Sequence, residues 1–373
     1  MTPQSVSPTV AKPTAGDFMP LHGIDHVELF VGNALQAAYF YVHAFGFKEV
    51  AYAGLETGSR EKVSHVLRSG RIRLVITGAL RSDSPIAAHQ HRHGDGVKVI
   101  ALGVPSVADA YREATARGAR SVAAPYELAD EHGAVKLASI AAYGETIHTF
   151  VERGGYDGPF LPGYEARDVG EETGMLLGVD HIVGNVEDMN PWVKFYEDVF
   201  GMREMIHFSD ADISTEYSAL MSKVVTNGSG SVKFPINEPA QAKRKSQIEE
   251  YLEFYEGPGA QHLALATRDI VGAVAELRRR GVEFLDIPAA YYDEVPERVP
   301  EVAPQLADLR RQGILVDRDD EGYLLQIFTK PIGDRPTVFF EVIERHGAKG
   351  FGDGNFKALF EALEREQERR GNL

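Results

Sequence analysis

The chain contains no cysteine among its 373 residues. Disulfide bonds, zinc–thiolate sites, iron–sulfur clusters and cysteine nucleophiles are therefore excluded. Any metal ion held by side chains must take His, Asp or Glu as its ligands.

The sequence also lacks long apolar runs and an excess of basic residues. No apolar stretch reaches the roughly 20 residues that span a bilayer, and the formal net charge is −16. Because phosphate backbones bind clustered positive charge, we expect no nucleic-acid partner, and we expect no membrane association. The first residues are rich in Pro, Thr, Ser and Ala, without a basic start or an apolar centre. We therefore predict a disordered tail over residues 1–20 and a cytoplasmic protein.

Two halves of the chain repeat one pattern. The segment Leu21–Val27 resembles Leu176–Ile182, and the similarity continues without gaps for more than twenty residues, with His26 and His181 separated by 155 residues. A second pairing sets Gly96–Leu102 against Gly259–Leu265, at a separation of 163 residues. Internal repeats of this kind indicate that one architecture occurs twice.

Each half contains two modules, in which a short apolar strand is followed by an amphipathic helix and then by further strands. This order predicts an α+β fold of four βαβββ modules, each half forming an open, β-barrel-like sheet with flanking helices. We place an N-terminal domain at residues 21–153, a glycine-rich linker at 154–175 and a catalytic domain at 176–373. No strand is followed by a glycine-rich phosphate loop, which argues against a dinucleotide fold.

Three residues of the C-terminal half are candidate metal ligands. His181 and His262 lie near the start of the first strand in consecutive modules. Either histidine alone is more simply a buried strand residue, but their matching places favour a shared site. Glu341 interrupts the apolar run Thr337–Ile343, and a buried carboxylate is costly unless it is paired or bound to a metal. The alternative is an edge-strand carboxylate that faces water.

Two imidazoles and one carboxylate form the facial triad typical of non-haem Fe(II) oxygenases. The same ligands also allow zinc, manganese or nickel, although a zinc hydrolase would need a further acid or base, and no HExxH motif is present. In the N-terminal half, His26 matches His181 and we align Glu152 with Glu341, but Val99 stands in the place of His262. We therefore expect one metal ion per chain, in the C-terminal half.

A second group of histidines, His89, His91 and His93, lies beside Arg92 and Asp95. Alternating histidines can bind metal, but this polar composition is more typical of a solvated surface loop. We predict such a loop.

The chain resembles the 4-hydroxyphenylpyruvate dioxygenase family of the vicinal-oxygen-chelate superfamily, from about Leu21 to Leu363. The stretches that carry the resemblance are Gly178–Asn185, Pro235–Pro239, Lys243–Ile248, Gln261–Leu265, Leu325–Pro331, Gly333–Glu341 and Gly350–Phe356.

The resemblance implies a set of site residues. Its three Fe(II) ligands fall on His181, His262 and Glu341. Its polar, catalytic pocket positions fall on Ser222, Asn237, Gln247, Gln261 and Gln326. The aromatic walls that hold the substrate fall on Phe328 and Phe356, and the surrounding substrate-binding shell falls on Pro235, Phe339, Phe351 and Asn355. The final helix, in which Phe356, Leu359, Phe360 and Leu363 share one apolar face, would be a C-terminal lid helix.

The same resemblance implies the activity. An enzyme of this family uses Fe(II) to convert 4-hydroxyphenylpyruvate and O2 to homogentisate and CO2 in tyrosine and phenylalanine catabolism, by oxidative decarboxylation, ring hydroxylation and side-chain migration. It also implies a homo-oligomer, a dimer or tetramer. The alternatives are a 4-hydroxymandelate synthase, which hydroxylates the benzylic carbon of the same substrate, a non-catalytic binding protein of the superfamily, and a zinc- or nickel-dependent glyoxalase. Pro235, Asn237 and Phe328 favour the homogentisate-forming type.

Overall fold

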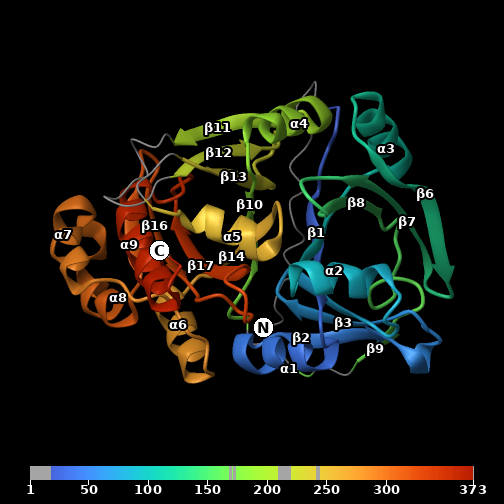
Figure 1. Ribbon diagram of the computed structural model, residues 1–373, viewed down its shortest axis with the longest axis horizontal. Helices are drawn as coiled ribbons and strands as arrows, with labels where there is room; N and C mark the ends of the chain where they lie inside the picture. The colour runs from blue at the N-terminus through green and yellow to red at the C-terminus, as the bar shows by residue number, and fades with distance from the viewer. Residues whose placement is uncertain (1–17, 168–169, 171–173, 209–219, 241–243, 373) are drawn as a thin grey trace, which may run out of the picture.

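The computed structural model describes residues 18–167, 170, 174–208, 220–240 and 244–372 (Figure 1). Residues 1–17 of the expected tail lie outside these ranges, whereas Met19 is buried in the main core. Among the helices of the described ranges, none combines the length and apolarity needed to cross a membrane.

Four βαβββ modules make up the molecule, as the repeats predicted. The N-terminal half contains β1 (Gly23–Val31), α1 (Ala34–Phe45), β2 (Lys48–Ala53), β3 (Lys62–Ser69) and β4 (Ile72–Ala79), then β5 (Gly96–Gly103), α3 (Val107–Ala116), β6 (Ser121–Asp130), β7 (Gly133–Ala141) and β8 (Ile147–Glu152). The C-terminal half contains β10 (Gly178–Asn185), α4 (Asn190–Phe200), β11 (Arg203–Phe208), β12 (Leu220–Thr226) and β13 (Lys233–Pro239), then β14 (Gly259–Ala266), α6 (Ile270–Arg279), β15 (Leu315–Arg318), β16 (Tyr323–Phe328) and β17 (Phe339–His346).

The remaining elements connect or cover these modules. Within each half, one helix lies between the two modules: α2 (Pro85–His93) and α5 (Gln247–Tyr255). The short elements are η1 (Leu55–Thr57), β9 (Glu165–Ala166), η2 (Ala289–Asp293), α7 (Val295–Arg298), η3 (Pro300–Gln305), α8 (Leu306–Gln312) and η4 (Asp353–Asn355), and the chain then forms α9 (Phe356–Arg370).

Each half forms one mixed sheet, and the two halves lie side by side in Figure 1. The N-terminal sheet has the order β6-β7-β8-β5-β1-β4-β3-β2-β9, and the C-terminal sheet has the order β11-β12-β13-β10-β14-β17-β16-β15. In both sheets the first strands of the two modules pair with each other, β1 with β5 and β10 with β14. The first strand of each module therefore lies at the centre of its sheet.

The strand register confirms one equivalence between the halves. Val183 pairs with His262 in the C-terminal sheet, and Glu28 pairs with Val99 in the N-terminal sheet. Glu28 and Val183 are separated by the repeat distance of 155 residues. Val99 therefore occupies the place of His262, as the sequence indicated.

The register also shows that our alignment of Glu152 with Glu341 is wrong. Glu341 lies opposite Ala264 on β14, whereas the equivalent Ala101 on β5 lies opposite Thr149. Thr149 is therefore the counterpart of Glu341, and of the three ligand positions in the N-terminal half only that of His26 carries a side chain of the ligand type.

Glu152 has a different role, which Glu344 shares in the other half. The Glu152 carboxylate accepts a hydrogen bond of 2.9 Å from the backbone N–H of Val107, at the start of α3. The Glu344 carboxylate accepts one of 2.7 Å from Ile270, at the start of α6. A negative charge beside the first N–H groups of a helix stabilises the helix.

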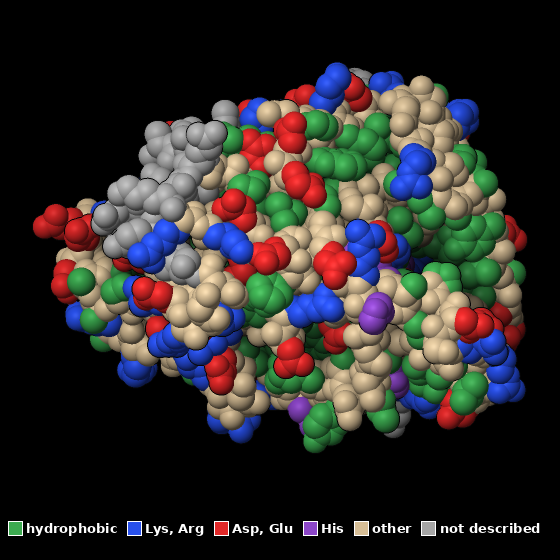
Figure 2. All heavy atoms as spheres, viewed as in Figure 1, with side chains coloured by type: hydrophobic (Ala, Val, Ile, Leu, Met, Phe, Trp, Pro, Cys, Tyr) green, Lys and Arg blue, Asp and Glu red, His purple; other side chains and the backbone are tan. Residues whose placement is uncertain are grey.

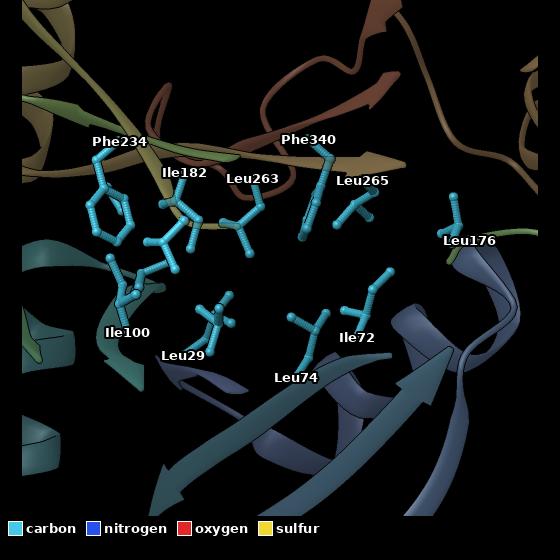
Figure 3. Close-up of a cluster of buried hydrophobic side chains, with 14 of the residues drawn as sticks. Leu29, Ile72, Leu74, Ile100, Leu176, Ile182, Phe234, Leu263, Leu265 and Phe340 are labelled. Atoms are coloured by element: carbon cyan, nitrogen blue, oxygen red, sulfur yellow. The ribbon is translucent and has the colours of Figure 1, made fainter. Parts of the chain in front are cut away.

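The main core lies between the two sheets. Each central strand points alternate side chains toward the other half, because successive residues of a strand face opposite sides. Figure 3 shows Leu29, Leu74 and Ile100 of the N-terminal half facing the side chains Ile182, Leu263 and Phe340 of the C-terminal half, all of one cluster. This packing leaves the other face of the C-terminal sheet for a site.

The prediction that His89, His91 and His93 lie in a solvated loop is wrong. They lie on α2, where His89 and His93 are only 3% and 2% exposed, and His91 is exposed. Helix α2 packs against α5 of the other half, seen beside it in Figure 1. Packing of α2 on β1 and β4 of its own half and on α5 of the other half therefore buries two of these histidines.

One buried hydrogen bond joins the halves inside the core. His148 Nδ1 donates to the Ile100 carbonyl at 3.2 Å, so His148 Nε2 accepts from the Tyr196 hydroxyl at 2.8 Å. Burial lowers the pKa of His148 to about 4, which keeps the ring neutral near pH 7.

We expect Tyr196→Phe to lower the free energy of unfolding by about 1–3 kcal/mol, because it leaves a buried acceptor, His148 Nε2, without a donor. Tyr39→Phe removes a hydroxyl from a side chain that is 64% exposed and should have almost no effect. Urea unfolding of both variants at pH 7 measures the difference, and equal stabilities would contradict a contribution from this bond.

Candidate metal centre

Three adjacent central strands, β10, β14 and β17, carry the three expected metal ligands. Ile182, Leu263 and Phe340 on these strands face the core between the sheets. Their neighbours His181, His262 and Glu341 therefore face the opposite side, where they line one cavity.

A β-bulge places a further polar side chain at the centre. On β14, His262 pairs with Val183 and Ala260 pairs with Gly184, so Gln261 is an extra residue between them. Such a bulge re-aims side chains locally. As a result, the consecutive residues Gln261 and His262 both line the cavity.

The three ligand atoms converge closely. Glu341 Oε2 lies 3.2 Å from His181 Nε2 and 3.4 Å from His262 Nε2. All three residues are buried, and within the described residues their ligand atoms lie within 4.8 Å of one another.

Hydrogen bonds on the far side of each ring orient both imidazoles. His181 Nδ1 donates to Asp180 Oδ1 at 2.8 Å, and His262 Nδ1 donates to Gln261 Oε1 at 2.9 Å. In the neutral rings each Nε2 then carries a lone pair that faces the Glu341 carboxylate. Lone pairs facing a carboxylate repel unless a cation lies between them, and His262 Nε2 and Glu341 Oε1 have no hydrogen-bond partner. This arrangement fits a divalent metal ion.

Burial and the neighbouring charges shift the pKa values of all three ligands. Burial alone would raise the pKa of Glu341, but the facing His181 and His262 rings outweigh it and hold that pKa below its ordinary value. Burial lowers the pKa of His262. Glu341 and Asp180 outweigh the effect of burial on His181 and raise the pKa of its ring above the ordinary value.

Asp180 is a supporting residue that the sequence reasoning missed. Its carboxylate accepts from His181 and also from Arg345, at 2.8 Å and 2.9 Å. Lys233 lies 3.4 Å away. These partners hold the pKa of Asp180 well below its usual range despite burial. The signal was present in the sequence, because Asp precedes His in both repeats.

The structure brings most of the predicted site residues around one cavity. The lining includes the expected residues His181, Ser222, Pro235, Asn237, Gln247, Gln261, His262, Phe328, Phe339, Glu341 and Phe351. It also includes Val183, Leu220 and Val224, which the sequence reasoning did not identify, and Leu359, Phe360 and Leu363 of α9. Helix α9 therefore covers the site, as expected of a lid.

Two predicted residues do not line the cavity, and the side chain of a third is not described. Gln326 lies on the same strand face as Phe328 and packs under Gly352. Asn355 is fully buried, and its Oδ1 accepts from the Tyr291 hydroxyl at 2.5 Å. Phe356 begins α9, but its side chain lies outside the described residues.

Amide groups link the cavity wall to the metal ligands. Gln261 Nε2 donates to Gln247 Oε1 at 3.3 Å, and Gln261 in turn orients His262. Gln247 is the first residue of α5, whose start is fixed by Ser246 and Glu249 in a capping box. On the other wall, Asn237 Nδ2 donates to Asn185 Oδ1 at 3.3 Å.

With α9 in place the cavity holds about 70 Å³. An engineered apolar cavity that admits one benzene ring measures roughly 150 Å³, about twice this volume. Leu359, Phe360 and Leu363 fill the rest of the space beside the ligands. An aromatic substrate therefore requires α9 to shift.

Comparison with known proteins identifies the family. The model of the Glyoxalase/Bleomycin resistance protein/Dioxygenase superfamily matches residues 23–136 and 178–327. Over 95% of its length the chain is 49% identical to the whole of 4-hydroxyphenylpyruvate dioxygenase from Dictyostelium discoideum. It is 47% identical to the enzyme of that name from Danio rerio, over 97% of this chain and 94% of the relative.

The chain belongs to the 4-hydroxyphenylpyruvate dioxygenase family. Among solved structures, a mutant 4-hydroxymandelate synthase from Streptomyces coelicolor is similar, with a TM-score of 0.85 and 36% identity over 92% of this chain and 98% of that chain. The family and the duplicated fold inferred from the sequence are thus confirmed.

We expect Asp180→Asn to weaken metal binding roughly 10- to 100-fold, because hydrogen bonds to ligating histidines fix their orientation and basicity. Asp25→Asn is a matched control, since Asp25 makes the same contacts with His26 and Arg153 in the other half. Metal titration of both variants, with the fold checked by circular dichroism, gives the affinities. Equal affinity for Asp180→Asn and the parent chain would contradict this supporting role.

Proposed function

We propose that this chain converts 4-hydroxyphenylpyruvate and O2 to homogentisate and CO2, with Fe(II) held by His181, His262 and Glu341. The observation that carries the proposal is the convergence of two imidazole lone pairs and a carboxylate inside a largely apolar cavity. Two histidines and one carboxylate with open positions are typical of non-haem Fe(II) oxygenases.

Bound Fe(II) supplies the activation of O2 on which decarboxylation and ring hydroxylation depend. The protein supplies binding, orientation and exclusion of water. The Phe328 ring stands edge-on to the His262 ring, with the centroids 5.8 Å apart, and the Phe339 ring stacks on it at 4.8 Å. Both offer apolar walls for an aromatic ring beside the metal ligands.

Polar groups on two walls would orient the substrate. Ser222 and Asn237 lie opposite each other on β12 and β13, and Gln247 and Gln261 lie on the wall formed by α5 and β14. All four are neutral hydrogen-bonding groups, suited to a phenol and a keto acid. We assign them to positioning, because the reaction needs no protein nucleophile.

Helix α9 would exclude water during the reaction. Its side chains Leu359, Phe360 and Leu363 line the cavity, and its C-terminal end contacts α5. There the buried Glu250 accepts hydrogen bonds from Arg370 and Asn372, at distances of 2.7 to 3.2 Å. Breaking and remaking these contacts would open and close the site.

Hydroxymandelate formation is the competing outcome. The solved 4-hydroxymandelate synthase is 36% identical to this chain, whereas the relatives named 4-hydroxyphenylpyruvate dioxygenase described above are 47% and 49% identical. The higher identity supports homogentisate as the product.

Incubation of the purified chain with Fe(II), O2 and 4-hydroxyphenylpyruvate should give homogentisate. The two candidate products are isomers, so NMR of the product is required to separate them. His181→Ala should lose both iron binding and turnover while keeping the fold. Hydroxymandelate as the main product would overturn the assignment, and turnover with full iron content in His181→Ala would overturn the ligand set.

We also propose that the protein is a cytoplasmic homo-oligomer, a dimer or tetramer, joined through β6. This strand ends the N-terminal sheet, and its side chains Val122 and Tyr126 are 47% and 45% exposed. An edge strand with exposed apolar residues readily pairs with another copy.

Light scattering on the eluting protein should give a multiple of the 41.0 kDa chain mass. Replacing Val122 and Tyr126 with Lys should shift the mass toward one chain. A monomer in the parent protein would refute oligomerisation, and an unchanged oligomer in the variant would place the contact elsewhere.

A further inference from the structure

A second group of ligand-type side chains lies in the N-terminal half, remote from the triad in sequence. His89 and His93 occupy successive turns of α2 and therefore share one face of that helix. Glu145, in the turn between β7 and β8, completes the group, and the three ligand atoms lie within 4.8 Å of one another.

The hydrogen bond of His93 fixes which nitrogen faces the group. His93 Nδ1 donates to the backbone carbonyl of Tyr255, at the end of α5. His93 Nε2 therefore carries a lone pair, and it lies 3.5 Å from Glu145 Oε2 without a hydrogen bond. A backbone acceptor on the far nitrogen is the usual partner of a metal-ligating histidine.

His89 is the member of this group whose burial the surrounding hydrogen bonds do not explain. It is 3% exposed, and neither ring nitrogen has a hydrogen-bond partner. A buried polar group left without a partner costs about 1–3 kcal/mol. Burial lowers the pKa of His89 to about 3, so the ring is neutral, which is the form that binds a metal. The ring stands 4.5 Å from that of His93, centroid to centroid.

We propose that His89, His93 and Glu145 form a second metal site, distinct from the iron centre, which binds Zn²⁺ with a water molecule as the fourth ligand. Two imidazoles, one carboxylate and one water are a set that Zn²⁺ accepts in tetrahedral geometry. Glu145 is 39% exposed at its side chain, which gives the ion and the water access from solvent.

Charged groups around the site set its affinity. Arg92 Nη1 lies 3.4 Å from Glu145 Oε1, and Arg92 also pairs with Glu256. Lys98 Nζ donates to the backbone carbonyl of Glu145 at 2.6 Å and lies 3.8 Å from its Oε2. Both cations weaken binding of a positive ion, whereas the carbonyl end of α2 favours it.

The site lies where the two halves meet. Arg335 of the C-terminal half donates to the carbonyls of His91 on α2 and Phe254 on α5, at 3.2 Å and 3.1 Å. Because α5 begins with Gln247 in the cavity wall, a metal ion at the other end of α5 would fix the contact between the halves next to the active site.

Equilibrium dialysis of the full chain against Zn²⁺, followed by metal analysis, should give two zinc ions per chain, because the iron ligands also accept zinc. The variants His89→Gln and Glu145→Gln should each bind one zinc ion per chain. His91→Ala is the matched control, since His91 is an exposed histidine on the same helix, and it should still give two.

Two further measurements separate loss of the site from loss of the fold. Circular dichroism should be unchanged in Glu145→Gln, whose side chain is partly exposed. Lys98→Met removes a competing cation and should tighten binding at this site, which a damaged fold cannot do. One zinc ion per parent chain, or two zinc ions retained in both ligand variants, would overturn the proposal.

Discussion

Apolar packing between the two sheet faces that face each other is the constraint on which the rest of the structure depends. Alternate side chains of every central strand point into that shared core, among them Ile182, Leu263 and Phe340. The residues between them must then face the opposite side, where His181 and Glu341 meet. The geometry of the site is thus a consequence of strand alternation around a fixed core. On the outside, acidic and basic side chains are interspersed over the face seen in Figure 2.

The parts of the site that could be predicted lie on strands that begin a module. The repeated segments that contain His181 and His262 align almost without insertions. Their matching positions could therefore be read directly from the sequence. Glu341 was recognisable as a carboxylate inside an apolar strand. Its counterpart in the other half was misplaced, because α7, η3 and α8 lengthen the connection between β14 and β15 and change the offset. Two glutamates, Glu152 and Glu344, share a role at helix starts instead, which sequence similarity alone could not reveal.

Other features depend on contacts between distant segments. Polar composition around His89 and His93 is typical of solvated loops, but α2 packs on β1, β4 and α5, and these contacts bury both rings. The bulge at Gln261 is likewise a property of pairing between strands. Strand alternation alone therefore could not explain why Gln261 and His262 both face the cavity, although the family resemblance assigned both to the site. Gln326 shares the strand face of Phe328, but it packs under Gly352 and does not line the cavity, and strand alternation cannot predict that contact.

The N-terminal half preserves the surroundings of a metal centre but keeps only one of its three ligands, His26. Asp25 bonds His26 at 2.7 Å and Arg153 at 2.7 Å, and Phe160 stands edge-on to His26 at 5.0 Å. Phe351 stands against His181 in the same way, at 4.9 Å. Yet valine and threonine occupy the other two ligand positions of this half. The supporting frame is therefore self-sufficient: its ion pair and ring contact assemble with no ion to organise them. In this architecture the ion pair and the ring contact that surround a metal centre therefore do not depend on a complete set of metal ligands.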